Sequence, residues 1–278
     1  MQFDTVVIVG VGLLGGSVGL ALRERQMAHK IIGVGRTGSS LQDALERGAI
    51  TQIETNVRQA CHQADLVVVC TPVQTVADYV AQSLPTAAPS ALVTDVGSTK
   101  QTICEAVPET EHGRFCGSHP LAGSDRSGVA HASPSLFENK LTIVTPTTAT
   151  TPDCIARTEQ FWRALGCRTL CMSPAEHDRA VAQTSHLPHV VAAALAGNTP
   201  LDLLPLAASG WCDTTRVAAG NVELWRQIIC ENRQPVLAAL RGFADSLEPW
   251  LAALESDDAR ELTRLLLLGK QQRDSVGN

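Results

Sequence analysis

Short apolar runs rich in Val and Ile alternate with amphipathic stretches over about the first 170 residues. Each run is apolar almost throughout, which is typical of strands that are buried on both faces of a parallel sheet. The runs occupy residues 5–9, 31–34, 65–70, 91–96, 141–145 and 167–171. Helical patterns lie between several of them, so we expect an α/β domain over residues 1–173.

After Pro174 the pattern changes, and one helical stretch follows another to the end of the chain. We expect these helices at 175–185, 189–197, 201–209, 222–254 and 257–272. One stretch carries apolar residues at three- and four-residue spacing, which predicts a buried stripe. The stripe contains Val236, Leu237, Leu240, Phe243, Leu247, Trp250, Leu251 and Leu254. A stripe of this length often continues into a partner subunit. Residues 174–278 are therefore predicted to form an all-α C-terminal domain, for which dimerisation is what the family resemblance given at the end of this section implies.

The sequence Gly-Val-Gly-Leu-Leu-Gly directly follows the first strand and opens a helix that runs from about Leu14 to Arg25. The first glycine permits a tight turn, the second lets the backbone approach a pyrophosphate, and the third lets helix and strand pack closely. This context indicates a Rossmann dinucleotide-binding domain, although a phosphate-free turn is the alternative. The predicted cofactor contacts here are Gly10, Gly12, Leu13, Leu14 and Gly15, joined after a later strand by Thr71, Pro72 and Gln74.

The end of the second strand lacks the Asp or Glu that usually binds the ribose hydroxyls of NAD. Arg36 stands there instead, followed by the hydroxyl residues Thr37, Ser39 and Ser40. An arginine makes charge-assisted contacts to a 2′-phosphate, which a carboxylate would repel. We therefore predict NADP over NAD; the alternative is a solvated arginine in a flexible loop.

Composition narrows the possible partners and the compartment. The net charge of −6 and the absence of a dense Lys/Arg run give little support for nucleic acid or an anionic membrane surface as partner. The nine cysteines form neither a Cys-x-x-Cys pair nor a Cys/His cluster at zinc spacing, which favours reduced thiols and no metal. No apolar run approaches a membrane span and no leader is recognisable, so we expect a cytoplasmic protein.

A histidine follows the apolar run at 114–116, inside the segment Gly-Ser-His-Pro-Leu-Ala-Gly-Ser-Asp at 117–125. Pro120 fixes one backbone dihedral directly after His119, and the flanking glycines allow close turns. We expect His119 to lie in a loop where an α/β sheet binds its ligands, with a satisfied structural histidine as the alternative. Ser98, in a segment expected to open a helix, lies near the nicotinamide or acts as a plain helix cap.

Two further polar groups fall in the helical half. Residues 185–189 place His186 and His189 around a proline at an expected helix boundary, where both could be caps. Asp213 stands three residues before Arg216, close enough to pair on one helical turn. An exposed ion pair of little energetic weight is the alternative.

Taken together, these motifs closely resemble the prephenate/arogenate dehydrogenase family of tyrosine biosynthesis, and most of all its compact NADP-dependent arogenate dehydrogenases. The motifs that carry the resemblance lie at 10–17, 70–72, 94–100, 118–123, 185–189 and 209–216. The resemblance implies a Rossmann domain, a helical domain that forms a homodimer, and a site that uses His119 as the catalytic histidine. It also implies that Ser98 hydrogen-bonds to that histidine and that Arg216 holds a substrate carboxylate.

In this family the substrate is a cyclohexadiene that loses a hydride from carbon 4 and carbon dioxide from carbon 1. Neutral His119 would accept the proton of the 4-hydroxyl, so we expect activity to fall near the ordinary histidine pKa of ~6.5. The resemblance places Asp125 with Asp213 and Arg216 in a polar network, although some relatives carry Glu at the position of Asp125. Further contacts to the substrate are expected from Ser124 and His189.

Arogenate differs from prephenate by an ammonium in place of a keto group. Glu223 or Asp213 could bind that ammonium, although Glu223 could equally be a solvated helix residue. The predicted function is NADP-dependent oxidative decarboxylation of arogenate, with a prephenate or dual-specificity dehydrogenase as the alternative.

Two rival functions remain open at this point. A β-hydroxyacid dehydrogenase or imine reductase would share the domain order, but normally uses a lysine or aspartate where this chain has residues 184–189. An NADPH-sensing binding protein would need the glycine fingerprint but not His119 and Arg216 at one site.

Overall fold

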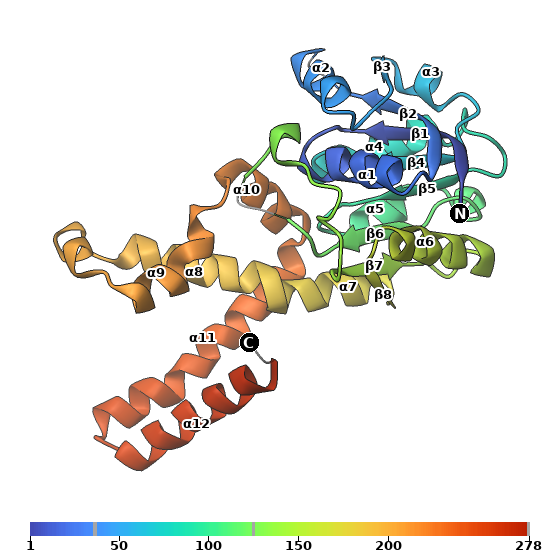
Figure 1. Ribbon diagram of the computed structural model, residues 1–278. Helices are drawn as coiled ribbons and strands as arrows, with labels where there is room; N and C mark the ends of the chain where they lie inside the picture. Colours follow the sequence, from blue (N-terminus) through green and yellow to red (C-terminus); the bar gives the residue numbers. More distant parts are fainter. Residues whose placement is uncertain (36–37, 124–125, 277–278) are drawn as a thin grey trace. The chain divides into compact units, whose positions relative to one another are not determined.

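The computed structural model describes residues 1–35, 38–123 and 126–276 of the chain. It divides into two compact units, residues 1–232 and residues 233–278. The first unit contains both β-sheets and the helices from α1 to α10, and the second contains α11 and α12 (Figure 1). The domain boundary after residue 173 that the sequence suggests stays a prediction.

A five-stranded parallel sheet forms the first half of the larger unit, in the order β3-β2-β1-β4-β5. Its strands are β1 (Phe3–Val9), β2 (Ala28–Val34), β3 (Gln52–Glu54), β4 (Leu66–Val69) and β5 (Leu92–Asp95). The chain order reverses at β1, which has β2 on one side and β4 on the other. In open α/β sheets such a switch point forms the crevice in which ligands bind.

The strands are buried on both faces, as their continuous apolar sequences predict. Along β1, Val6 and Ile8 pack into one core and Val7 and Val9 into the other. The first core also contains Phe137, Phe161 and Trp162, whereas helices α3 and α4 contribute to the second. Helices on both faces of a parallel sheet confirm the predicted Rossmann architecture.

The helices associated with this sheet follow its strands in sequence. They are α1 (Leu13–Glu24), α2 (Gly38–Glu46), α3 (Val57–Cys61), α4 (Val73–Ser83) and α5 (Gln101–Ala106). A further helix, α6 (Pro152–Ala164), comes later in the chain and packs against β5. Helix α5 begins at Gln101 rather than at Gly97, so Ser98 precedes the helix and does not cap it. The backbone N–H groups at its start donate instead to the carboxylate of Asp178.

A second, three-stranded sheet contains β6 (Gly117–Pro120), β7 (Leu141–Thr145) and β8 (Arg168–Cys171), with β6 antiparallel to β7. This corrects the expectation that His119 lies in a loop after the apolar run at 114–116. The apolar run at 114–116 contributes one bridge, between Phe115 and Val93, and the strand itself starts at Gly117. His119 therefore lies in a strand, not in a loop.

The rest of the larger unit is helical, and the described residues after Cys171 contain no strand. Helices α7 (Pro174–Val181) and α8 (Leu187–Asn198) are joined by a π turn over Ala182–His186, so the helical backbone continues without a break from His186 into α8, which carries His189. Pro188 lacks a backbone N–H, and a local widening of the helix accommodates it. A 3₁₀ helix (Leu201–Leu206), α9 (Ser209–Thr215), a 3₁₀ turn (Arg216–Ala219) and α10 (Val222–Glu231) follow.

The smaller unit pairs α11 (Arg233–Glu255) with α12 (Ala259–Val276). Most of the apolar stripe predicted to be buried on α11 is exposed in this single chain: Leu247, Leu251 and Leu254 are 43%, 52% and 64% exposed. Within the stripe, only Val236 is buried. No helix among the described residues is both long and apolar enough to cross a membrane.

Candidate active site

The glycine-rich turn after β1 has the geometry that its sequence predicts. Gly10 has φ +93°, and a Cβ there would lie 2.7 Å from the carbonyl oxygen of Cys70, so a side chain is excluded. A Cβ on Gly15 would lie 2.1 Å from the carbonyl oxygen of Gly10. In contrast, nothing lies within 4 Å of a Cβ on Gly12, the residue that precedes α1. The turn therefore fits a pyrophosphate that approaches the backbone at Gly12 and the N-terminus of α1.

The other expected cofactor contacts surround this turn where the structure describes them. Thr71 follows β4, and its buried Oγ1 has no hydrogen-bond partner among the described residues. Pro72 and Gln74 are exposed at the start of α4, and Ser39 and Ser40 lie in the first turn of α2. The expected 2′-phosphate contacts Arg36 and Thr37 lie outside the described residues.

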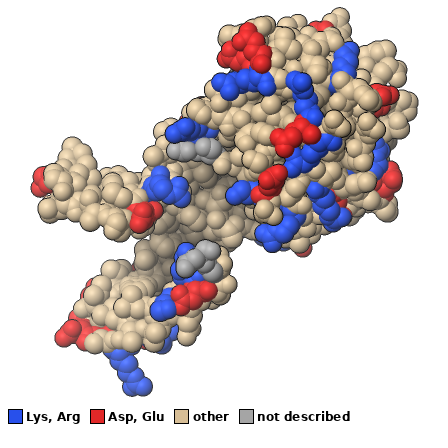
Figure 2. Space-filling model, viewed as in Figure 1, with Lys and Arg blue, Asp and Glu red and all other residues tan. Residues whose placement is uncertain are grey.

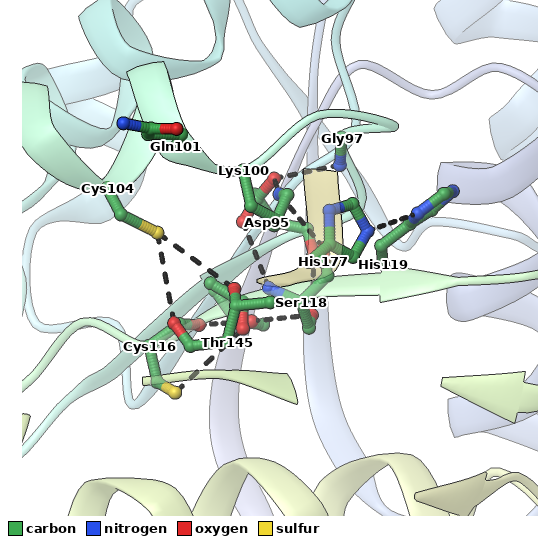
Figure 3. A network of polar contacts seen from close by, with 12 residues as sticks. Asp95, Gly97, Lys100, Gln101, Cys104, Cys116, Ser118, His119, Thr145 and His177 are labelled. Atoms are coloured by element: carbon green, nitrogen blue, oxygen red, sulfur yellow. Dashed lines mark hydrogen bonds and ion pairs between the residues drawn. The ribbon is translucent and has the colours of Figure 1, made fainter. Parts of the chain in front are cut away.

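A buried polar cluster joins the carboxyl end of β5 to β6 (Figure 3). Lys100 and Asp95 form an ion pair with fully buried side chains. The carboxylate of Asp95 also accepts from the backbone N–H groups of Gly97 and Ser118, and Nζ of Lys100 donates to the carbonyl oxygen of Ser118 at 3.1 Å. Asp95 lies beside Val69 at the end of β4, so this cluster holds β6 next to the cofactor crevice.

His119 follows Ser118 in β6 and is partly exposed. Its Nδ1 lies 2.9 Å from Nε2 of His177 in α7, as Figure 3 shows. Nδ1 of His177 lies 2.7 Å from Oδ1 of Asp178. No group of the described residues hydrogen-bonds to Nε2 of His119, so this nitrogen is available to a ligand.

Burial is the main influence on the protonation of these histidines. It holds the pKa of His119 well below its usual range, and His177, Lys100 and His186 act in the same direction. Burial also lowers the pKa of His177 against the opposing effect of Asp178, and lowers that of His186 to about 4. His119 is therefore neutral at pH 7, as a general base must be.

Ser98, His186 and His189, which the sequence analysis singled out, differ in their burial and hydrogen bonds. Ser98 is partly buried, and the described residues show no hydrogen bond between Ser98 and His119. His189 is buried and stacks on Trp225 with ring centroids 3.6 Å apart, while its Nδ1 lacks a partner within the described parts of the chain. His186 accepts from Asn232 at 3.0 Å.

The expected pairing of Asp213 with Arg216 is not present. Both side chains are exposed and no ion pair joins them; the α-helix ends at Thr215 and Arg216 begins a 3₁₀ turn, so helical spacing is not kept. Glu223 is also exposed, and its carboxylate accepts two hydrogen bonds from Arg226, which lower its pKa to about 2. Ser124 and Asp125 lie outside the described residues.

Sequence reasoning did not single out His177, Asp178 or the Asp95–Lys100 pair. His177 and Asp178 lie in the stretch 175–185, which was interpreted only as a helix. The signal that could have found them is the adjacency of two ionisable residues, a histidine and an aspartate. Their link to His119 crosses 58 residues of chain, which no local pattern reveals.

The surface charge of the face shown in Figure 2 is mixed. Lys and Arg side chains lie among Asp and Glu side chains over the larger body, not in one continuous basic stripe. An anionic ligand would then be held by local groups such as the α1 N-terminus.

Comparison with known proteins gives one consistent family. A model described as the nucleotide-binding domain of prephenate dehydrogenase matches residues 18–171, and one described as its dimerization domain matches residues 173–268. Prephenate dehydrogenase of Bacillus subtilis (strain 168) is 33% identical over 282 residues, covering 98% of this chain and 76% of the relative.

Two solved structures are similar over nearly their full length. The crystal structure of prephenate dehydrogenase from A. aeolicus in complex with hydroxyphenyl propionate and NAD+ has a TM-score of 0.92 at 30% identity and covers 99% of both chains. The crystal structure of Synechocystis arogenate dehydrogenase has a TM-score of 0.84 at 33% identity, covering 98% of this chain and 99% of that one.

Proposed function

Because the chain belongs to the prephenate dehydrogenase family, we propose that it catalyses the NADP-dependent oxidative decarboxylation of arogenate to tyrosine. The observation that carries the proposal is a neutral histidine whose Nε2 has no hydrogen-bond partner among the described residues, on a strand that the Asp95–Lys100 cluster holds next to the cofactor crevice. A non-catalytic nucleotide sensor has no need of such a group.

His119 is the proposed general base for the substrate's hydroxyl proton. Nε2 accepts the proton of the hydroxyl on ring carbon 4 as that carbon loses its hydride. A nicotinamide held at the glycine-rich turn would supply the hydride acceptor. Loss of carbon dioxide from carbon 1 makes the ring aromatic and leaves a phenolate, to which His119 returns the same proton. A positioned general base contributes on the order of 10²- to 10⁴-fold in rate.

The substrate's charged groups are assigned to the exposed residues of α9 and the turn that follows. Arg216 binds the side-chain carboxylate, for which its planar fork offers two parallel donors. Asp213 binds the ammonium of arogenate, because the carboxylate of Glu223 already forms an ion pair with Arg226. His189, Ser124 and Asp125 complete the proposed substrate contacts, and Ser98 stays the proposed catalytic neighbour of His119.

NADP is assigned from the residues after β2. The sequence offers Arg36, Thr37, Ser39 and Ser40 to a 2′-phosphate and no carboxylate that would repel it. The open Cβ position at Gly12 supports a dinucleotide at this crevice, as does the Oγ1 of Thr71, which has no partner in the part of the chain that the structure describes.

A prephenate or dual-specificity dehydrogenase is the second candidate, favoured by the similarity to prephenate dehydrogenases. The two substrates share the ring and both carboxylates and differ only in the ammonium or keto group of the side chain. The choice between them therefore rests on the proposed contact of Asp213 with the ammonium.

The proposed function is tested by initial rates of NADPH formation at 340 nm with arogenate and with prephenate, each supplied with NADP and with NAD. We expect turnover of arogenate with NADP, at a kcat/KM at least ten times that with NAD or with prephenate. A preference for prephenate or NAD would replace the corresponding assignment. Cofactor binding, followed by tryptophan fluorescence, without turnover of either substrate would favour the sensor.

A further inference from the structure

His119, His177 and Asp178 form a line of three hydrogen-bonding side chains that runs inward from the site. The two contacts, 2.9 Å between the imidazoles and 2.7 Å from His177 to the carboxylate, are both within hydrogen-bond range. The side chain of His177 is fully buried and that of Asp178 is 3% exposed. The line joins β6 to α7.

The carboxylate at the inner end of this line is firmly held. Oδ1 of Asp178 accepts from the backbone N–H of Lys100 at 2.8 Å, and Oδ2 accepts from that of Gln101 at 3.0 Å. These are the N–H groups at the start of α5, for which no side chain of the helix's own N-cap provides an acceptor. The backbone carbonyl of Asp178 accepts in addition from the amide of Asn232 at 2.7 Å.

Each hydrogen bond in the line determines the direction of the next. A carboxylate can only accept, so Nδ1 of His177 carries a proton. A neutral imidazole has one N–H, which leaves Nε2 of His177 as an acceptor; the nearby Lys100 disfavours a second proton. Nδ1 of His119 must then be the donor, and Nε2 of His119 carries the lone pair.

We propose that His177 and Asp178 are positioning residues that hold neutral His119 in its Nδ1–H tautomer, so that Nε2 is free to accept the substrate's proton. The inference rests on the proposed function only in naming that proton. After transfer, Nδ1–H of the His119 imidazolium still donates to His177, whose ring is polarised by the Asp178 carboxylate. The line therefore orients the base before the transfer and stabilises its charge afterwards.

Two variants of similar size separate this role from simple packing. In His177→Gln the amide oxygen replaces Nε2 as the acceptor for His119, whereas His177→Leu fills the space without any acceptor. For His177→Leu we expect kcat to fall about 10- to 100-fold, with KM changed by less than about threefold, because a partly mispositioned base loses part of the general-base contribution. His177→Gln should remain within about fivefold of the wild type.

A matched control is His112→Leu. His112 is another buried histidine of the same unit, hydrogen-bonded to Thr147 and to the carbonyl of Val107 and to no member of the line. The His112→Leu variant should leave kcat unchanged when rates are compared per folded molecule, with folding checked by circular dichroism. Equal losses in the Leu and Gln variants of His177 would overturn the proposal.

The tautomer itself is read without any turnover, by long-range ¹H–¹⁵N correlation on protein labelled with ¹⁵N-histidine, with His119→Asn identifying the signals of His119. We expect Nδ1–H in the wild type and in His177→Gln, and Nε2–H as the main form in His177→Leu. An Nε2–H form in the wild type, or no change in His177→Leu, would refute the inference. Because this measurement needs no substrate, it stands if neither arogenate nor prephenate is turned over, an outcome that would reject only the proposed function.

Discussion

At the scale of single residues, surroundings rather than residue type decide what His119 does. The sequence places a histidine beside Pro120, and from its ordinary pKa a loss of activity near pH ~6.5 is expected. The structure changes that expectation, because burial and the neighbouring His177 and Lys100 resist a positive charge on the ring. The neutral form persists to lower pH than in a solvated histidine.

We therefore expect kcat/KM to stay level through pH 6.5 and to fall only at lower pH, where His119 gains a proton. The profile is measured with the free enzyme and subsaturating substrate, and activity after return to pH 7.5 reports any irreversible loss. His119→Asn should lose most activity and also this acidic limb. A limb at or above pH 6.5, or the same limb in His119→Asn, would contradict the assignment.

At the scale of elements, one buried ion pair positions β6. Lys100 and Asp95 bind one another and both reach Ser118, so the strand that carries His119 is tied to the end of β5. The sequence predicted β5 well but gave no sign of this connection, since β6 is short and contains Pro120. An element of four residues is defined by its partners more than by its own pattern.

The pair should matter for stability as well as position. Lys100→Met leaves the Asp95 carboxylate buried without its cation, which costs about 3–5 kcal/mol. We expect this loss in the free energy of unfolding from urea titrations. Lys140→Met, at an exposed lysine, should change it by less than about 0.5 kcal/mol. Similar losses of unfolding free energy in the two variants would mean that water or a structural relaxation offsets the cost of leaving the Asp95 carboxylate without its cation.

At the scale of the whole molecule, the exposed apolar side chains of the smaller unit suggest a second copy of the chain. Leu247, Leu251 and Leu254 are exposed on α11, as are Leu266 and Leu267 on α12. Large exposed apolar side chains on neighbouring helices are typical of interfaces, and the matching family model is described as a dimerization domain. We propose a homodimer through these helices.

Light scattering after gel filtration should give twice the chain mass of 29.5 kDa. The double variant Leu247→Lys/Leu251→Lys should shift the protein towards the monomer, because charges would be buried at the interface. Leu170→Lys, at an exposed leucine of β8 that precedes the region matched by the dimerization model, should remain dimeric. A monomeric wild type, or a double variant that stays fully dimeric, would reject this interface.

The sequence by itself determined the features that depend on local pattern. Continuous apolar runs gave β1, β2, β4 and β5, the glycine spacing gave the turn before α1, and helical periodicity gave the all-α half. Short or irregular elements, such as β3 and the π turn before α8, were missed because their patterns are too brief to recognise.

Only the tertiary structure decided which polar groups meet. It joined His119 to His177 across 58 residues, bound Asp178 to the start of α5, and separated Asp213 from Arg216. It also showed the α11 stripe to be exposed in one chain. The physical reason is the same in each case: hydrogen bonds and burial depend on distances between side chains, and these are set by how the elements pack, not by their spacing in sequence.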